Sequence, residues 1–207
     1  FMFYNLFHFH VRRDDIMSEW FVQFSGAEAV FCLFVPVNKQ FSTYIKFADD
    51  VKALADELKL KKINILGWSD GGNTGIEFAI KYPKNTNKVI TSGANVFPNG
   101  VGESEVENMK KDAAKMKAEN KPERDIRLLQ LMIDEPKITK EQLNLLKAKV
   151  FVLAGENDLI LRSHTEYIAK EIPNSKLKFY KGASHGVPIE RAEELNKDVI
   201  DFIKKLN

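Results

Sequence analysis

Residues 63–72 read Ile63-Asn64-Ile65-Leu66-Gly67-Trp68-Ser69-Asp70-Gly71-Gly72, and this stretch decides the fold. A short apolar run precedes the pattern G-x-S-x-G, and a helical pattern from about residue 72 to 82 follows it. A serine held on a sharp turn from strand to helix brings its neighbours' backbones close together, which favours glycine on both sides. The context therefore predicts that Ser69 is a nucleophile at the carboxyl end of a strand. The alternative is a glycine-rich turn that only connects two elements.

A serine hydroxyl needs a base to take its proton and an acid to orient that base. Asp158 follows the apolar run 150–154, and His185 lies in the loop after the next predicted strand. The order Ser, Asp, His along the chain is the order expected when such a serine sits on a parallel sheet. We predict His185 as the base and Asp158 as the acid; Glu156 is the rival acid.

The groups around the nucleophile also have predicted roles. The first backbone N–H of the helix after Ser69 belongs to Asp70, and a helix N-terminus favours a developing oxyanion. Asp70 N–H is therefore a predicted oxyanion donor. The side chains of Asp70 and Trp68, on either side of the serine, are predicted to contact substrate. Alternatively, Asp70 caps the helix or bonds to a neighbouring side chain.

From about residue 42 onward the sequence alternates helical and strand patterns, which predicts an α/β fold with a mainly parallel sheet covered on both faces. The chain length favours one domain for residues 1–207. Ser42 or Thr43 can cap the first helix, and Ser163 with Glu166 predicts a capping box for a later one. The last helix is predicted to be amphipathic, with these residues on its inner side: Ile189, Ala192, Leu195, Val199, Phe202 and Ile203.

Residues 98–147 are charged and helical and carry no strand pattern. Val106, Met109 and Ala113 form a helical stripe, Pro122 can open a second helix, and Thr139 with Gln142 predicts a capping box for a third. We interpret this segment as a helical lid inserted into the fold. The alternative is a set of ordinary helices that cover the sheet.

The composition narrows the classes of partner. The 31 Lys and Arg residues nearly balance the 29 Asp and Glu residues, so no strong field favours nucleic acid or an anionic membrane. No apolar run reaches the length of a membrane span, and the first residues make a poor signal peptide. The single Cys32 is expected to be a small core residue in a reducing, cytoplasmic setting. The histidines lack metal-binding spacing, and the predicted chemistry needs no cofactor, so the expected partner is a small ester or amide.

These motifs resemble one branch of a known family. The elbow, Gly67-Trp68-Ser69-Asp70-Gly71-Gly72, is the turn from strand to helix that carries Ser69, and its sequence is similar to that of the valacyclovir hydrolase (biphenyl hydrolase-like) branch of the α/β-hydrolases. Further segments similar to this branch are Ser92-Gly93-Ala94-Asn95, the run 154–158 and Ala183-Ser184-His185. The resemblance covers roughly residue 41 to the C-terminus. The resemblance implies an α/β-hydrolase fold and a serine esterase. It also implies that Asp70, directly after the nucleophile, anchors the α-amino group of amino-acid esters. A general carboxylesterase or lactonase is the rival activity.

The first forty residues depart from this branch. The family carries a His-Gly loop that donates the first oxyanion N–H, and a second glycine-rich turn, but residues 1–40 contain Gly26 as their only glycine. We interpret residues 1–40 as an atypical or truncated N-terminal segment. If it does not rebuild the missing strand, the sheet has an unprotected edge and the chain should associate. A degenerate hydrolase fold that binds without turnover is therefore the second hypothesis.

Overall fold

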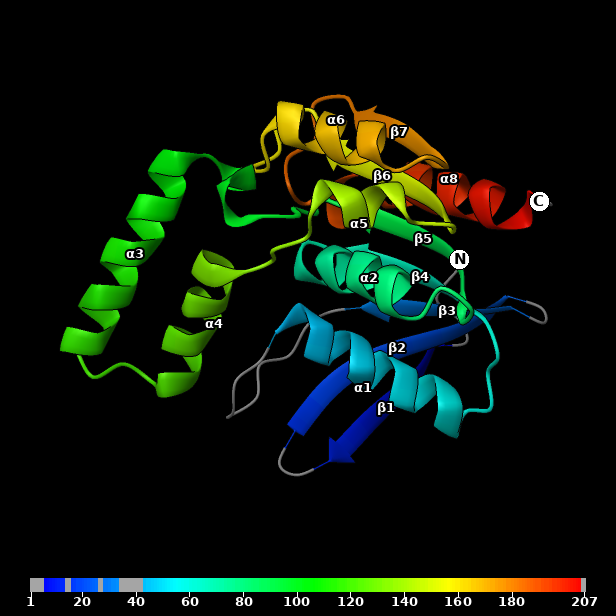
Figure 1. Ribbon diagram of the computed structural model, residues 1–207, viewed down its shortest axis with the longest axis horizontal. Coiled ribbons are helices and arrows are strands. Elements are labelled where there is room, and N and C mark those ends of the chain that lie inside the picture. The colour runs from blue at the N-terminus through cyan, green and yellow to red at the C-terminus, as the bar shows by residue number, and fades with distance from the viewer. Residues whose placement is uncertain (1–5, 14–15, 26–27, 34–42, 206–207) are drawn as a thin grey trace.

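The structure is a computed structural model that describes residues 6–13, 16–25, 28–33 and 43–205, with side chains placed from residue 43 onward (Figure 1). The strands are β1 (Leu6–Arg13), β2 (Ile16–Ser25), β3 (Glu28–Leu33), β4 (Ile63–Trp68), β5 (Thr86–Ser92), β6 (Lys149–Gly155) and β7 (Ser175–Tyr180). The helices are α1 (Tyr44–Glu57), α2 (Asp70–Lys81), η1 (Pro98–Val101), α3 (Glu103–Ala118), α4 (Glu123–Asp134), α5 (Lys140–Asn144), α6 (Arg162–Glu171), α7 (Val187–Glu190) and α8 (Ala192–Lys204).

The strands form one sheet in the order β1-β2-β3-β4-β5-β6-β7. Strands β3 to β7 run parallel, whereas β1, β2 and β3 pair antiparallel. This confirms the predicted α/β fold with a mainly parallel sheet. In a parallel sheet the carboxyl ends of all strands meet at one edge, which is where such folds place their ligands. The loops after β4, β5, β6 and β7 therefore lie side by side.

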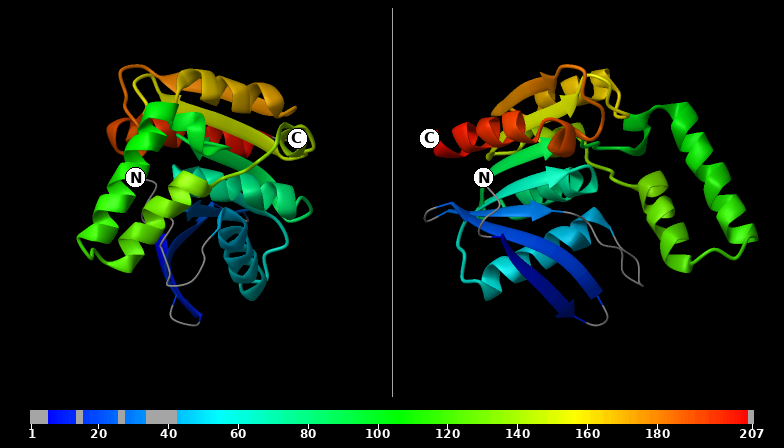
Figure 2. Two further views of the ribbon diagram at one scale, coloured as in Figure 1. Left: turned by 60° about the vertical axis from the view of Figure 1, so that its left-hand side comes forward. Right: turned by 180° about the vertical axis from the view of Figure 1, so that it is seen from behind.

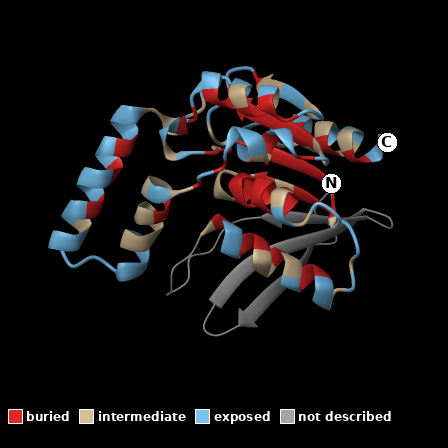
Figure 3. Cartoon of the chain, viewed as in Figure 1, coloured by how far each residue is buried: buried red, intermediate tan, exposed pale blue. Residues whose placement is uncertain are grey.

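Helices cover both faces of the parallel part of the sheet, because successive side chains of a strand point to opposite faces. Val89 and Val150 pack with α2, α5 and α6 on one face. Ile90 and Phe151, one residue farther along, pack with α8 on the other. The right-hand view of Figure 2, seen from behind, shows α8 (red) on the near face of the sheet, and Figure 3 shows the buried residues concentrated between these layers.

The N-terminal strands extend the sheet beyond β4. Val30 in β3 pairs with Asn64 in β4 in parallel register, so β4 is not an edge strand. The condition for an unprotected edge at β4 is therefore not met. The expectation that Cys32 is a core residue concerns a side chain that lies outside the described residues.

The segment 98–147 contains no strand, as predicted, but it divides into two parts. Helices α3 and α4 form a hairpin that projects away from the sheet (Figure 1). Leu131 of α4 anchors it in a small cluster with Tyr44 and Phe47 of α1. Helix α5 instead belongs to the sheet cover, because Leu143 is fully buried in the main core. Thr139 and Gln142 form the predicted capping box of α5.

Two sequence predictions about helix ends are wrong. The N-cap of α6 is Leu161, so Ser163 lies inside the first turn, where it cannot cap the helix. Ile189 is 74% exposed, because the helical path breaks at Arg191 between α7 and α8. The break changes the helical phase, so the periodicity of α8 does not extend back to residue 189. Thr43, by contrast, caps α1 as predicted.

Within the described residues, no helix combines the length and the apolar character that a membrane span requires.

Candidate active site

Ser69 occupies the turn between β4, which ends at Trp68, and α2, which begins at Asp70. Its backbone has φ 54° and ψ −121°, a conformation that costs a residue with a side chain about 1–3 kcal/mol. Ser69 N–H donates to the Ser92 carbonyl at 2.8 Å, which fixes the turn to the end of β5. A Cβ on Gly67 would lie 2.2 Å from the Gly71 carbonyl oxygen, so position 67 requires glycine. The close backbone approach predicted from the sequence is thus present.

The start of α2 provides the electrostatic environment of Ser69. Asp70 is the first residue of α2, and the first N–H groups of a helix have no acceptor within the helix. The same end of the helix carries the positive end of its dipole. An anion that forms beside Ser69 would therefore meet an N–H donor and a favourable field.

Asp158 and His185 meet at the ends of the neighbouring strands β6 and β7. Asp158 Oδ1 lies 2.7 Å from His185 Nδ1, and it also accepts from Ile160 N–H at 3.0 Å. Gly155 N–H donates to the other carboxylate oxygen at 3.2 Å. Burial alone would raise the pKa of Asp158, but the hydrogen bonds from His185 and Ile160 outweigh burial and lower it below its ordinary value. Asp158 is thus held ionised against the imidazole.

The rival acid Glu156 has a different partner. Its Oε2 accepts from Gly182 N–H at 2.9 Å, at the start of the loop that carries His185. Glu156 therefore supports that loop, while Asp158 contacts the imidazole itself.

The end of β5 lies between the turn of Ser69 and the Asp158–His185 pair. Gly93, which follows Ser92, has φ 61°, and a Cβ there would lie 2.7 Å from His185 Nδ1 and 3.2 Å from Asp158 Oδ2. The backbone of residues 92–93 thus contacts the turn of Ser69 on one side and the Asp158–His185 pair on the other. The three predicted catalytic residues come from three different strand ends and converge on this point.

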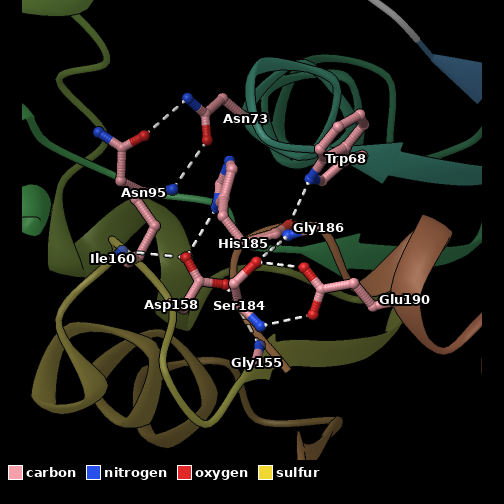
Figure 4. A network of polar contacts seen from close by, with 10 residues as sticks. All are labelled: Trp68, Asn73, Asn95, Gly155, Asp158, Ile160, Ser184, His185, Gly186 and Glu190. Atoms are coloured by element: carbon pink, nitrogen blue, oxygen red, sulfur yellow. Dashed lines mark hydrogen bonds and ion pairs between the residues drawn. The ribbon is translucent and has the colours of Figure 1, made fainter. Parts of the chain in front are cut away.

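Trp68 contacts the histidine loop. Its indole Nε1–H donates to the His185 carbonyl at 2.8 Å, and the two ring centroids are 5.9 Å apart (Figure 4). Since an indole has a single N–H donor, a substrate cannot use that donor without displacing the His185 carbonyl. The predicted substrate contact of Trp68 is then limited to the surface of its ring.

Asp70 bonds to a neighbouring side chain. Tyr44 of α1 donates its hydroxyl to Asp70 Oδ1 at 2.5 Å. Burial raises the pKa of Asp70, and the hydrogen bond from Tyr44 offsets part of that rise. This role of Tyr44 could not be predicted from the sequence, because the residue is also the first apolar position of an amphipathic helix.

A partly buried pair of asparagines connects α2 to the loop after β5. Asn73 Nδ2 donates to Asn95 Oδ1 at 2.9 Å, and Asn95 N–H donates to Asn73 Oδ1 at 2.9 Å (Figure 4). Sequence reasoning missed this pair, since two asparagines 22 positions apart show no local pattern.

His164 is buried and has a backbone partner in the loop after β5. Its Nε2 accepts from Val96 N–H at 3.0 Å, which requires a neutral ring, and burial lowers its pKa to about 4. Among the residues whose side chains are described, no group of three His, Cys, Asp or Glu could hold a metal ion.

Comparisons with known proteins agree with this architecture. The sequence model of the family described as alpha/beta hydrolase fold matches residues 32–135, half of the chain. The human protein "Serine hydrolase BPHL" is 27% identical over 174 residues, which cover 76% of this chain and 60% of that protein. The 2-hydroxy-6-oxo-6-phenylhexa-2,4-dienoate hydrolase of Comamonas testosteroni is 26% identical over 75% of this chain and 67% of its own length.

Solved structures show the same fold. A thermophilic esterase from Thermogutta terrifontis superimposes with a TM-score of 0.63 at 22% identity, over 83% of this chain and 75% of that chain. The chain spans only 60% of the length of the human relative.

Proposed function

The chain belongs to the alpha/beta hydrolase fold family, and from that premise we propose that it is a serine hydrolase that cleaves small carboxylic esters or amides through an acyl-enzyme. The observation that carries the proposal is the 2.7 Å contact between Asp158 and His185 beside a serine held at positive φ. Strained backbone at a residue with a side chain is a mark of functional sites. The names of the relatives, which are hydrolases, support the same class of reaction.

The proposed reaction uses each residue in one role. His185 takes the proton of the Ser69 hydroxyl, and the oxygen attacks the carbonyl carbon of the substrate. The oxyanion of the tetrahedral intermediate forms near Asp70 N–H. His185 then gives its proton to the leaving alcohol or amine, which leaves an acyl group on Ser69. Water, activated by the same imidazole, hydrolyses the acyl-enzyme, and Asp158 stabilises the imidazolium in both halves.

A fluorophosphonate probe tests this proposal, because it reacts with activated serines. We expect the wild-type chain to be labelled on Ser69, as located by peptide mass spectrometry, and Ser69→Ala to remain unlabelled. If the folded wild-type chain is not labelled, the alternative of a degenerate hydrolase fold that binds without turnover is favoured instead.

Within this class, we propose α-amino-acid esters as the favoured substrates. The carboxylate of Asp70 directly follows the nucleophile and has no cationic partner within hydrogen-bond distance among the described side chains. A substrate ammonium beside the scissile carbonyl could pair with it, and a charge-assisted hydrogen bond is worth about 1.5–3 kcal/mol. The resemblance of the Gly67–Gly72 sequence to the valacyclovir hydrolase branch implies the same role for Asp70.

One observation favours a second candidate, a general carboxylesterase or lactonase. Tyr44 already donates to Asp70 Oδ1 at 2.5 Å, which is what a purely structural carboxylate would show. Comparing an α-amino ester with its des-amino analogue separates the two. For an amino-ester hydrolase, Asp70→Asn lowers kcat/KM for the amino ester by roughly ten- to hundredfold and spares the des-amino ester. Equal losses on both esters identify Asp70 as structural and favour the general esterase.

A further inference from the structure

The backbone of His185 is held by groups other than Asp158. On one side, Trp68 Nε1–H donates to the His185 carbonyl at 2.8 Å. On the other, Glu190 accepts from Ser184 N–H at 2.9 Å and from the Ser184 hydroxyl, which in turn accepts from Gly186 N–H at 3.2 Å. Figure 4 shows His185 between these two supports. The residue before His185, the residue after it and its own carbonyl are thus all fixed.

Trp68 and Glu190 come from different parts of the chain. Glu190 lies five positions beyond His185 in the same part of the chain, so it stabilises the loop only against itself. Trp68 is the covalent neighbour of Ser69, so it ties the histidine loop to the residue that this histidine must serve. A shift of the elbow therefore carries the loop with it.

From this geometry we infer that Trp68 is a positioning residue that sets the separation between Ser69 and His185, an inference that rests on the proposed serine hydrolase function. Proton transfer between a hydroxyl and an imidazole requires hydrogen-bond distance, and small displacements of reacting groups cost large factors in rate. The hydrogen bond from Trp68 fixes the His185 backbone relative to the turn that carries Ser69, and so sets that distance. Asp158 then fixes the tautomer and charge of the imidazole ring.

The side chain suits this role because it is rigid and carries a hydrogen-bond donor. Trp68 is half-buried. A tryptophan has only two side-chain torsions, so once its ring contacts His185 at 5.9 Å, few conformations remain to it. Its indole N–H donates to the backbone carbonyl of residue 185. That acceptor is present whatever side chain stands at this position.

The test is Trp68→Phe, which keeps an aromatic ring and removes the N–H. The matched control is Tyr180→Phe, which removes an aromatic donor bound at the same distance, 2.8 Å to Asp198, on the strand that leads to the histidine loop. The labelling rate with a fluorophosphonate is measured over a range of probe concentrations. This separates the maximal rate of reaction at Ser69 from the half-saturating concentration. Rates are corrected for the folded fraction from a denaturation curve.

For Trp68→Phe we expect the maximal rate to fall about tenfold with the half-saturating concentration unchanged, because one hydrogen bond no longer holds the loop. Tyr180→Phe should leave both quantities unchanged. A Trp68→Phe enzyme that reacts at the wild-type maximal rate would overturn the inference. So would an equal loss in the control, because that loss would reflect general destabilisation.

A second measurement keeps the inference testable if the wild-type chain does not react, which would contradict the proposed function and not this role. The nitrogen-15 and proton signals of the His185 imidazole report its position in the folded protein without any turnover. We expect one sharp set in the wild type and shifted or exchange-broadened signals in Trp68→Phe, with Tyr180→Phe like the wild type. Identical His185 signals in all three proteins would show that Trp68 does not position the ring.

Discussion

The strand-end loops and the α3–α4 hairpin are held together in opposite ways. At the strand ends, hydrogen bonds join different elements: Ser69 N–H reaches the Ser92 carbonyl, and Gly93 N–H reaches Leu153. In the hairpin, the ion pairs Glu107–Lys110 and Glu123–Arg127 each lie within one helix. Contacts within an element maintain its shape, whereas contacts between elements maintain the position of one element relative to another. Catalytic chemistry depends on the second kind.

The largest effect is expected at Ser69 and His185, where the bonds between elements converge. Ser69→Ala and His185→Ala should each lower kcat for an activated ester by about 10⁶, since either change removes the proton-transfer unit. The double variant should be no slower than either single one, and circular dichroism should show all three folded. A double variant far slower than both would mean that the two residues act independently.

Asp158→Asn comes next, with an expected loss of about 10⁴ in kcat, because the amide favours the wrong imidazole tautomer. Glu156→Gln is the control and should keep its activity, since a glutamine oxygen can still accept from Gly182 N–H. The hydrogen bonds from His185 and Ile160 lower the pKa of Asp158, so it stays ionised at any pH above the ordinary aspartate pKa of 3.8. Acid inactivation above that pH should therefore not come from Asp158. If Glu156→Gln is the damaging change, the acid is Glu156.

The sequence predicted the parts of the site that local patterns encode. The glycines around Ser69 reflect a steric need of a single turn, and the apolar runs before Gly67 and Gly155 mark strands whose ends carry the predicted catalytic residues. The parallel order then places Asp158 and His185 at one edge of the sheet. Fold, strand ends and the order of the three residues were all accessible in this way.

What the sequence did not reveal depends on contacts between elements. Tyr44 donates to Asp70 across 26 positions, and Trp68 to His185 across 117. Neither bond has a period or a spacing that a single sequence could display. The error at Ile189 has the related cause that one broken turn resets the helical phase.

The third expected effect is on stability, at the junction between the α3–α4 hairpin and the core. Glu77 of α2 is only 6% exposed, and burial together with the nearby Glu135, which follows α4, raises its pKa to about 7, while Lys81 opposes the rise. Because the folded-state pKa is raised, this carboxyl contributes stability at low pH that is lost as the pH rises from about 4.5 through 7. The junction of hairpin and core is therefore weakened at alkaline pH.

Glu77→Gln should accordingly raise Tm by roughly 2–4 °C at pH 8, which corresponds to about 1 kcal/mol in a chain of this size, and by less at pH 5. The measurement is thermal unfolding at both values. Glu57→Gln, an exposed position on α1, is the control and should change Tm at neither pH. A gain for Glu77→Gln that is equal at pH 5 and pH 8 would contradict the titration of Glu77.

The smallest effect is expected within the hairpin. Glu123, an exposed residue, pairs with Arg127 at 2.9 Å, four positions along the same helix, and such a pair is worth about 0.3–0.5 kcal/mol. The counterpart is Glu171, a buried residue that pairs with Lys140 at 3.2 Å and joins α6 to α5. Urea unfolding should show that Glu123→Gln lowers the free energy of unfolding by no more than that amount. Glu171→Gln should lower it by more, because the change breaks a contact between elements and leaves a buried polar group.

Added salt should abolish the Glu123 effect, since an exposed pair is screened, and should leave most of the Glu171 effect. If Glu123→Gln and Glu171→Gln lower the free energy of unfolding equally at low salt, a contact between elements is worth no more than a contact within one helix. The contrast drawn between the two regions would then be wrong.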